Sequence, residues 1–467
     1  MFARSLTNAV FFSFFLASGS FAQSIEIQIN HTAALDDDYL CWSPQPARAR
    51  VLGSVSSDIR AVISSEAVSA TSTGQVQFQV VAGNSVSVDD FAPEDTLTLM
   101  LPASGEWVDF FVAGKRPSTL TKDVVVQARS ESDGLPLGAV QTMVRVRKDA
   151  RTMTTAERQL FLEVSRTLHD NGDFEKYYIA HEAAFSDDIH FMFRPPHPPL
   201  FLAWHRAFLL NFERELQEIN PDVSLPYWKF DEPSFLPGEA SIFSADFLGE
   251  TQSSNPVVRF NDSLSTTPNP WHDWRVNRQT RPIERKRVAD RAPFFGAGLV
   301  QGPIDQNMLS QILGASGNDE HKNAGGDIEL DYHNGAHSRI LGWLGRGYSP
   351  ADPLFFLLHA NVDRAFAHWQ ERHDAWDATG TDAKSYHATG SYPGSGSNYL
   401  RGSYALDEMW PWNNTHSDWP SGMFFVMPDG PDGAATVPTP ASQIDYLNLS
   451  GVGVASGACY DDIVYKQ

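Results

Sequence analysis

The chain has 467 residues, of which 42% are hydrophobic, and its formal net charge is −22. This length predicts roughly two or three domains, each with an apolar core. The acidic balance argues against nucleic acid and anionic membrane surfaces as partners, because both are negatively charged. The sequence indicates no oligomeric state.

Residues 1–22 have the pattern of a secretory signal peptide. Arg4 supplies a positive charge, residues 9–17 form a short apolar core, and residues 20–22 form a candidate cleavage site before Gln23. The apolar run is too short to cross a bilayer, and no later stretch is long enough to do so. We therefore expect a secreted or periplasmic protein without a membrane span.

Residues 23–148 alternate apolar and polar side chains with the period of a β-strand. Strands are predicted at residues 24–29, 76–80, 107–112, 124–128 and 142–146. The Gly, Ser, Asp and Pro turns between them favour a β-sandwich. This region has no ligand-type cluster, so we expect a supporting domain.

A mainly α-helical domain is predicted for residues 152–376. Its first helix, at residues 156–168, opens with a capping box formed by Thr154 and Glu157. A second amphipathic helix is predicted at residues 206–219. Residues 377–467 are rich in Gly, Ser, Pro and Asp, which predicts a loop-rich extension packed on the core.

The two cysteines, Cys41 and Cys459, lie near opposite ends of the chain. In an oxidising compartment they can pair and tie the N-terminal domain to the extension. They can equally be two unpaired apolar side chains, because the sequence does not give the distance between them.

Six histidines form two clusters in the helical domain. The first contains His181, His197 and His205, and the second contains His333, His337 and His359. His333 and His337 are four residues apart, so they share one helix face, and His359 comes from a second helix. Imidazole suits copper, and three protein ligands per ion leave positions for dioxygen and substrate. These clusters predict two copper ions in a four-helix bundle.

Two segments carry a family resemblance. Residues 201–206 (FLAWHR) and 352–364 (DPLFFLLHANVDR) resemble the two copper signatures of type 3 copper proteins, in the tyrosinase and catechol oxidase branch. The resemblance covers residues 152–373. It implies a dinuclear copper centre that uses dioxygen to hydroxylate monophenols and to oxidise o-diphenols to o-quinones.

The sequence departs from the family pattern in three ways. His197 and His205 are eight positions apart, one fewer than usual, so His190 is an alternative second ligand. The position before the last ligand, often a second histidine in the family, is Leu358. No cysteine lies near either cluster, so the cysteine–histidine thioether of some relatives is absent.

The resemblance also implies roles for Glu329 and Asn334, which flank His333. In relatives that hydroxylate monophenols, this pair is thought to hold a water that removes the phenol proton. A phenol has a pKa of about 10 and needs a positioned base at neutral pH. The alternative is a structural carboxylate and an asparagine in a turn.

Residues after the second cluster have less defined roles. Asp363 and Arg364 follow the last ligand, and they either orient an imidazole or brace the bundle through salt bridges. Residues 345–350 are expected to line the entrance to the site, with Gly347 leaving space for bulky phenols.

Other functions remain open from the sequence alone. One is a catechol or o-aminophenol oxidase that lacks monophenol hydroxylation. Another is a dioxygen carrier, which is disfavoured because the chain is of modest size and holds a single copy of the copper-binding region. A third is a structural metal bundle. Turnover of catechol separates an enzyme from a carrier.

Overall fold

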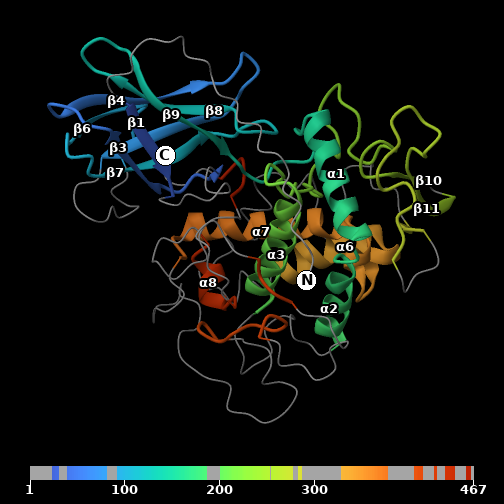
Figure 1. Cartoon of the computed structure of the whole chain (residues 1–467). Coiled ribbons are helices and arrows are strands. Elements are labelled where there is room, and N and C mark those ends of the chain that lie inside the picture. The colour runs from blue at the N-terminus through green and yellow to red at the C-terminus, as the bar shows by residue number, and fades with distance from the viewer. Residues whose placement is uncertain are drawn as a thin grey trace, which may run out of the picture.

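The computed structural model describes residues 24–30, 39–80, 92–186, 200–252, 254–276, 282–286, 328–376, 404–413, 425–428, 437–446 and 459–463. A β-rich N-terminal region is followed by a helical region, as the sequence predicts (Figure 1). The predicted signal peptide lies outside the described residues. In the part of the chain described, no helix has the length and apolar character needed to span a membrane.

The β-rich region contains two sheets. The four-stranded sheet has the antiparallel order β1 (Ser24–Ile29), β3 (Gln45–Leu52), β7 (Val108–Arg116) and β5 (Gln75–Val80). The five-stranded sheet has the order β2 (Tyr39–Leu40), β9 (Pro136–Val144), β8 (Val124–Ser130), β4 (Ile59–Ala67) and β6 (Thr96–Leu101).

The sheets approach closely where β9 passes β1. A Cβ atom on Gly138 would lie 2.0 Å from the carbonyl oxygen of Ile25, so only glycine fits there. Strand β1 has the predicted bounds, because alternate isoleucines point into the core. Strands β2, β3, β4 and β6 are absent from the predicted set. In β3 the inward positions include small alanines, Ala47 and Ala49, which give little hydrophobic signal.

The helical region begins with α1 (Thr155–Asp170). The Thr154 hydroxyl accepts from the Glu157 amide, and the Glu157 carboxylate accepts from the Thr154 amide, which confirms the capping box. The other elements are α2 (Glu175–Ser186), α3 (Phe201–Ile219), the hairpin β10 (Glu250–Gln252) and β11 (Asn255–Arg259), the π-helix η2 (Ile328–His333), α6 (Asn334–Ile340), the 3₁₀ turns η3 (Gly342–Gly345) and η4 (Ser349–Ala351), α7 (Leu354–His373) and α8 (Pro440–Ile444).

Helix α3 differs from the predicted amphipathic helix. It begins earlier, at Phe201, and residues 201–216 are all buried. Segments of the C-terminal extension cover the face that the sequence assigns to solvent. Trp204 Nε1 donates to the carbonyl of Trp410 at 2.7 Å, and Trp412 Nε1 donates to Asn211 Oδ1 at 2.7 Å.

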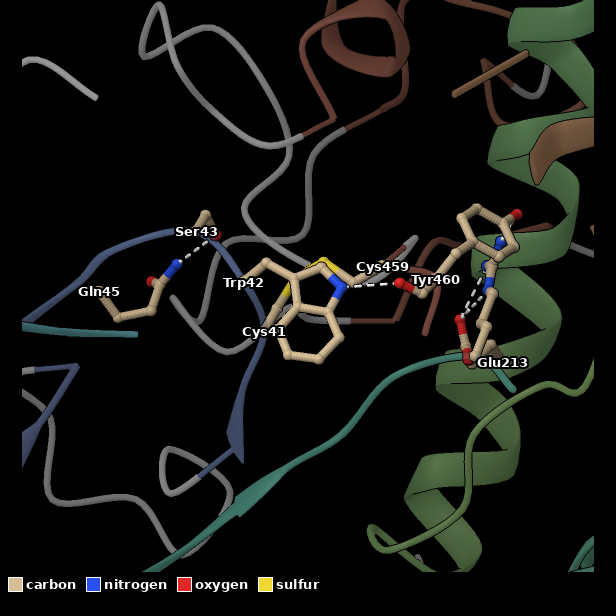
Figure 2. The surroundings of a disulfide bond; sticks show 8 residues. Cys41, Trp42, Ser43, Gln45, Glu213, Cys459 and Tyr460 are labelled. Atoms are coloured by element: carbon tan, nitrogen blue, oxygen red, sulfur yellow. Dashed lines mark hydrogen bonds and ion pairs between the residues drawn. A yellow bond between two sulfur atoms is a disulfide. The ribbon is translucent and has the colours of Figure 1, made fainter. Parts of the chain in front are cut away.

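A disulfide joins the β-rich region to the C-terminal extension. Cys41 and Cys459 are bonded, with their Cα atoms 6.2 Å apart, within the normal range for a disulfide. Beside it, Trp42 Nε1 donates to the carbonyl of Tyr460 at 2.7 Å (Figure 2). The Arg147 amide donates to the carbonyl of Cys459 at 2.7 Å. The structure thus decides the pairing that the sequence leaves open.

A buried ion network continues from this junction into the helices. Arg147, with a fully buried side chain, donates to Glu213 Oε2 at 2.7 Å and to Asp363 Oδ2 at 3.1 Å. Asp363 Oδ2 also accepts from the Tyr460 hydroxyl at 2.6 Å, and its Oδ1 accepts from Arg206 Nε at 2.6 Å. The network therefore ties α3 and α7 to the N-terminal region and to the extension.

Candidate metal centre

Five of the six predicted ligand histidines come together in the helical region. They are His181 of α2, His205 of α3, His333 at the end of η2, His337 of α6 and His359 of α7. His359 is central, because its ring centroid is 4.2 Å from that of His205 and 4.7 Å from that of His333. The ring of His181 is farther out, 6.4 Å from His359 by centroids.

The second predicted set forms a tight trio. Nε2 of His359 is 3.2 Å from Nε2 of His333 and 3.1 Å from Nε2 of His337. One nitrogen from each ring lies within 4.8 Å of the others. Imidazole nitrogens bound to one first-row metal ion at about 2 Å in tetrahedral geometry lie about 3.3 Å apart. The spacing therefore fits one metal ion among the three rings.

Backbone carbonyls orient the rings. Nδ1 of His337 donates to the carbonyl of Leu344 at 2.5 Å, and Nδ1 of His181 donates to the carbonyl of Gly347 at 2.6 Å. A neutral ring that donates from Nδ1 carries its lone pair on Nε2. In His337 this is the nitrogen that faces His359, so the carbonyl sets the tautomer required of a ligand.

This donor set fits a cation. Nε2 of His359 can carry one proton, so it can donate to only one of the two nitrogens that face it at 3.1 and 3.2 Å. Whichever nitrogen it bonds to, the other nitrogen is left at hydrogen-bond distance without a hydrogen bond. A cation among the three nitrogens attracts all of them, and three imidazoles are a donor set that suits copper.

Burial keeps two rings of the trio, His337 and His359, neutral. Desolvation lowers the pKa of His337 to about 4. Desolvation, reinforced by the neighbouring imidazoles, lowers the pKa of His359 well below its ordinary value. Neutral imidazole is the form that binds a metal ion, so neither ring has to lose a proton at neutral pH.

Two phenylalanines enclose the histidines, although the sequence analysis assigns them no role. The ring of Phe355 stacks on His359 with centroids 4.0 Å apart. The ring of Phe201 lies 4.4 Å from His205 and 4.8 Å from His333. Each phenylalanine precedes a histidine of its own helix by four positions, which places both on one face. That four-residue spacing is the feature of the sequence that indicates an apolar, water-excluding wall around the site.

A cavity of about 400 Å³ opens beside the histidines. Its described lining includes His333, His337, Glu329 and Asn334. Glu329 is only 2% exposed and belongs to the π-helix η2, a rare conformation that is frequent at functional sites. The structure therefore brings the two residues predicted for proton transfer to the same cavity wall as the histidines.

Part of the predicted entrance segment, residues 345–350, lines the cavity, but the role predicted for Gly347 is corrected. Gly345, Arg346 and Ser349 line the cavity. A Cβ atom on Gly347 would lie 3.2 Å from the ring of Phe185, so the absent side chain accommodates Phe185 rather than a bulky phenol.

Asp363 and Arg364 brace the helices. Among the described residues, Asp363 accepts from two guanidinium groups and a tyrosine hydroxyl, and no imidazole contacts it. Arg364 Nε donates to Asp462 at 2.9 Å. The structure therefore favours the bracing role over the orientation of a ligand.

His197 and its alternative His190 lie outside the described residues. If His197 is the ligand, His197→Ala should lose the first copper ion while His190→Ala keeps both. Copper per chain, measured by atomic absorption, separates the two. The reverse result would assign the ligand to His190.

Comparisons with known proteins agree with a copper-binding histidine site. A family model described as the common central domain of tyrosinase matches residues 171–372. The chain is 30% identical to a tyrosinase of Streptomyces antibioticus over 238 residues, covering 49% of this chain and 84% of the relative. It is 30% identical to a tyrosinase of Streptomyces glaucescens over 287 residues, covering 58% and 93%. It is 29% identical to a grixazone synthase of Streptomyces griseus over 269 residues, covering 50% and 86%.

A histidine cluster among helices, matched to these relatives, defines a type 3 copper protein. The chain belongs to the tyrosinase family. Its cofactor is accordingly a dinuclear copper centre, and its class is that of an oxidoreductase acting on phenols.

Proposed function

We propose that this protein hydroxylates monophenols and oxidises o-diphenols to o-quinones with dioxygen. The observation that carries the proposal is the position of Glu329 and Asn334 on the wall of the histidine cavity. Family membership supports phenol oxidation in general. A buried carboxylate beside an amide supports the harder reaction, because a monophenol must lose its proton first.

The proposed ligand sets follow the two sequence clusters. His181, His197 and His205 hold one ion, and His333, His337 and His359 hold the other. The 3.1 and 3.2 Å nitrogen separations support the second set. The carbonyl-anchored ring of His181 and the short distance from His205 to His359 support the first. Helices α2, α3, α6 and α7 then form the ligand-bearing four-helix bundle.

The side chains of this protein position the reacting groups, exclude water from the histidine rings and supply a base. When bound, the two copper ions supply dioxygen activation and the two-electron oxidation of the phenol. Phe201 and Phe355 exclude water from the rings. Glu329, with Asn334, holds a water that takes the hydroxyl proton of an incoming monophenol, and the carboxylate of Glu329 receives that proton.

Loss of the base should affect monophenols selectively. An o-diphenol has a more acidic first hydroxyl and a second oxygen to chelate the metal, so it depends less on the base. We expect Glu329→Gln and Asn334→Ala to lower monophenol turnover by about 10²- to 10⁴-fold, with a far smaller loss on diphenols. Parallel assays with tyrosine and DOPA on copper-loaded protein measure the ratio.

Ser338→Ala is the matched control, because Ser338 lines the same cavity on α6. It should leave both activities nearly unchanged. Equal losses on both substrates in Glu329→Gln would mean that Glu329 supports folding or copper binding instead. If the unmutated protein oxidises only diphenols or o-aminophenols, the hydroxylase proposal fails and the oxidase remains.

We also propose that the protein works outside the cytoplasm. The disulfide between Cys41 and Cys459 supports an oxidising compartment, in which such bonds persist. The signal-like pattern of residues 1–22 supports the same location. The β-rich region is then a sandwich that braces the exported enzyme.

A further inference from the structure

The loop after α6 is anchored to both histidine sets. The carbonyl of Leu344 accepts from His337, and the carbonyl of Gly347 accepts from His181. Arg346 lies between these two carbonyls in the chain. Its position relative to the rings is therefore set by one hydrogen bond to each proposed copper site.

The backbone of Arg346 is itself held in place. Its amide donates to the carbonyl of Trp343 at 3.2 Å, and its own carbonyl accepts from the Ser349 amide at 3.0 Å. Its side chain is exposed and lines the histidine cavity. A rigid backbone at the cavity mouth thus carries a long cationic side chain.

The guanidinium of Arg346 is available for a ligand. Across the described residues it makes no hydrogen bond or ion pair, whereas Arg206, Arg285 and Arg364 each bond to an aspartate. The one other charged side chain in the described lining is Glu329, which is buried. The cavity therefore has a carboxylate beside the histidines and a cation at its exposed rim.

We propose that Arg346 selects phenols that carry a carboxylate on a short side chain opposite the reacting hydroxyl. This inference rests on the proposed phenol oxidation. The hydroxyl end reaches the histidines, and the ring lies against the apolar side chains of Phe201, Leu341 and Leu344. The carboxylate then meets the guanidinium, which matches its geometry through two parallel N–H···O bonds.

The charge of the whole protein makes this cation decisive. A net charge of −22 repels anions and attracts cationic phenols. Arg346 reverses that preference locally, at the point where the substrate side chain leaves the cavity. Without Arg346, a carboxylate would enter an acidic protein with no compensating contact in the described lining.

The test compares three catechols that differ only in the side chain. We expect Arg346→Gln to lower kcat/KM for 3,4-dihydroxyphenylpropionate by about threefold to tenfold, through KM. The same variant should change kcat/KM for neutral 4-methylcatechol by less than about twofold. Arg346→Glu should lower the carboxylate value further and raise the value for dopamine. Arg346→Lys should restore part of the loss. Lysine keeps the positive charge but lacks the two parallel N–H donors of the guanidinium.

Arg339→Gln is the matched control, because Arg339 lies near the end of α6 but not in the described cavity lining. It should leave the ranking of the three catechols unchanged. An equal change for all three substrates in Arg346→Gln, or the same selective loss in Arg339→Gln, would overturn the assignment.

A binding measurement separates this inference from the proposed function. Calorimetric titration with 3-phenylpropionate, which has no hydroxyl to oxidise, should show binding that weakens in Arg346→Gln and not in Arg339→Gln. If no catechol is oxidised but this difference persists, the proposed function fails and the carboxylate site stands. If catechols are oxidised but the two variants bind 3-phenylpropionate equally, the carboxylate site fails alone.

Discussion

Replacing Arg147 with methionine should lower the free energy of unfolding by about 3–5 kcal/mol, because breaking a buried ion pair leaves an uncompensated charge. The guanidinium is fully buried and bonds to Glu213 and Asp363. Asp363 keeps its bond from Arg206, but Glu213 loses its cation. Urea unfolding of the oxidised protein measures the change.

Arg60→Met is the control for this prediction. Its ion pair with Glu131 is exposed, with side chains 55% and 40% accessible, so solvent screens the pair and its loss should change the urea midpoint far less than the loss of Arg147 does. Adding Glu213→Gln to Arg147→Met should recover part of the stability, since it removes the uncompensated carboxylate. Equal effects of the Arg60 and Arg147 variants would mean that the network adds nothing beyond a surface pair.

The same network bears on truncation of the β-rich region. A chain that begins at residue 151 loses Arg147 together with the strands and the disulfide. Loss of activity in such a chain would therefore follow from an unpaired Glu213 and would not by itself place a catalytic residue in the sheets.

Replacing His337 with alanine should abolish phenol oxidation and reduce bound copper from two ions per chain to about one. The ring supplies one of three converging nitrogens, at 3.1 Å from Nε2 of His359, and the reaction requires both ions. Copper content and DOPA oxidation are measured on the same preparation.

His272→Ala is the control for the ligand prediction. Nδ1 of His272 contacts the carbonyl of Asn269 at 3.0 Å in a loop apart from the cluster. This variant should keep both ions and normal turnover. Normal turnover in His337→Ala would remove His337 from the ligand set, and His333 and His359 would then need another partner.

Local signals in the sequence were sufficient for many elements. The alternation at residues 24–29 predicts β1 with its observed bounds, and the Thr154 and Glu157 capping box predicts the start of α1. Spacing and signature predict six ligand histidines, and five of them meet in one cluster. These features depend on residues close together in the chain, or on side chains specific enough to identify themselves.

Other features depend on contacts between distant residues. Strand β3 is stabilised by pairing with β1 and β7, and helix α3 is covered on its outer face by the C-terminal extension. The proximity of Cys41 to Cys459 follows from the docking of that extension. The residue pattern within one segment could not predict these contacts, because each contact depends on where a distant segment lies in the fold.

The amino-acid sequence by itself determined the order of the two regions, the family and most of the candidate metal ligands. The tertiary structure alone decided how those ligands are held and what surrounds them. The carbonyls of Leu344 and Gly347 orient His337 and His181, and Arg147 joins Glu213 to Asp363. Side-chain identity is written in the sequence, whereas a backbone carbonyl is the same in every residue. Only the fold selects which carbonyl meets an imidazole, and which charges are buried together.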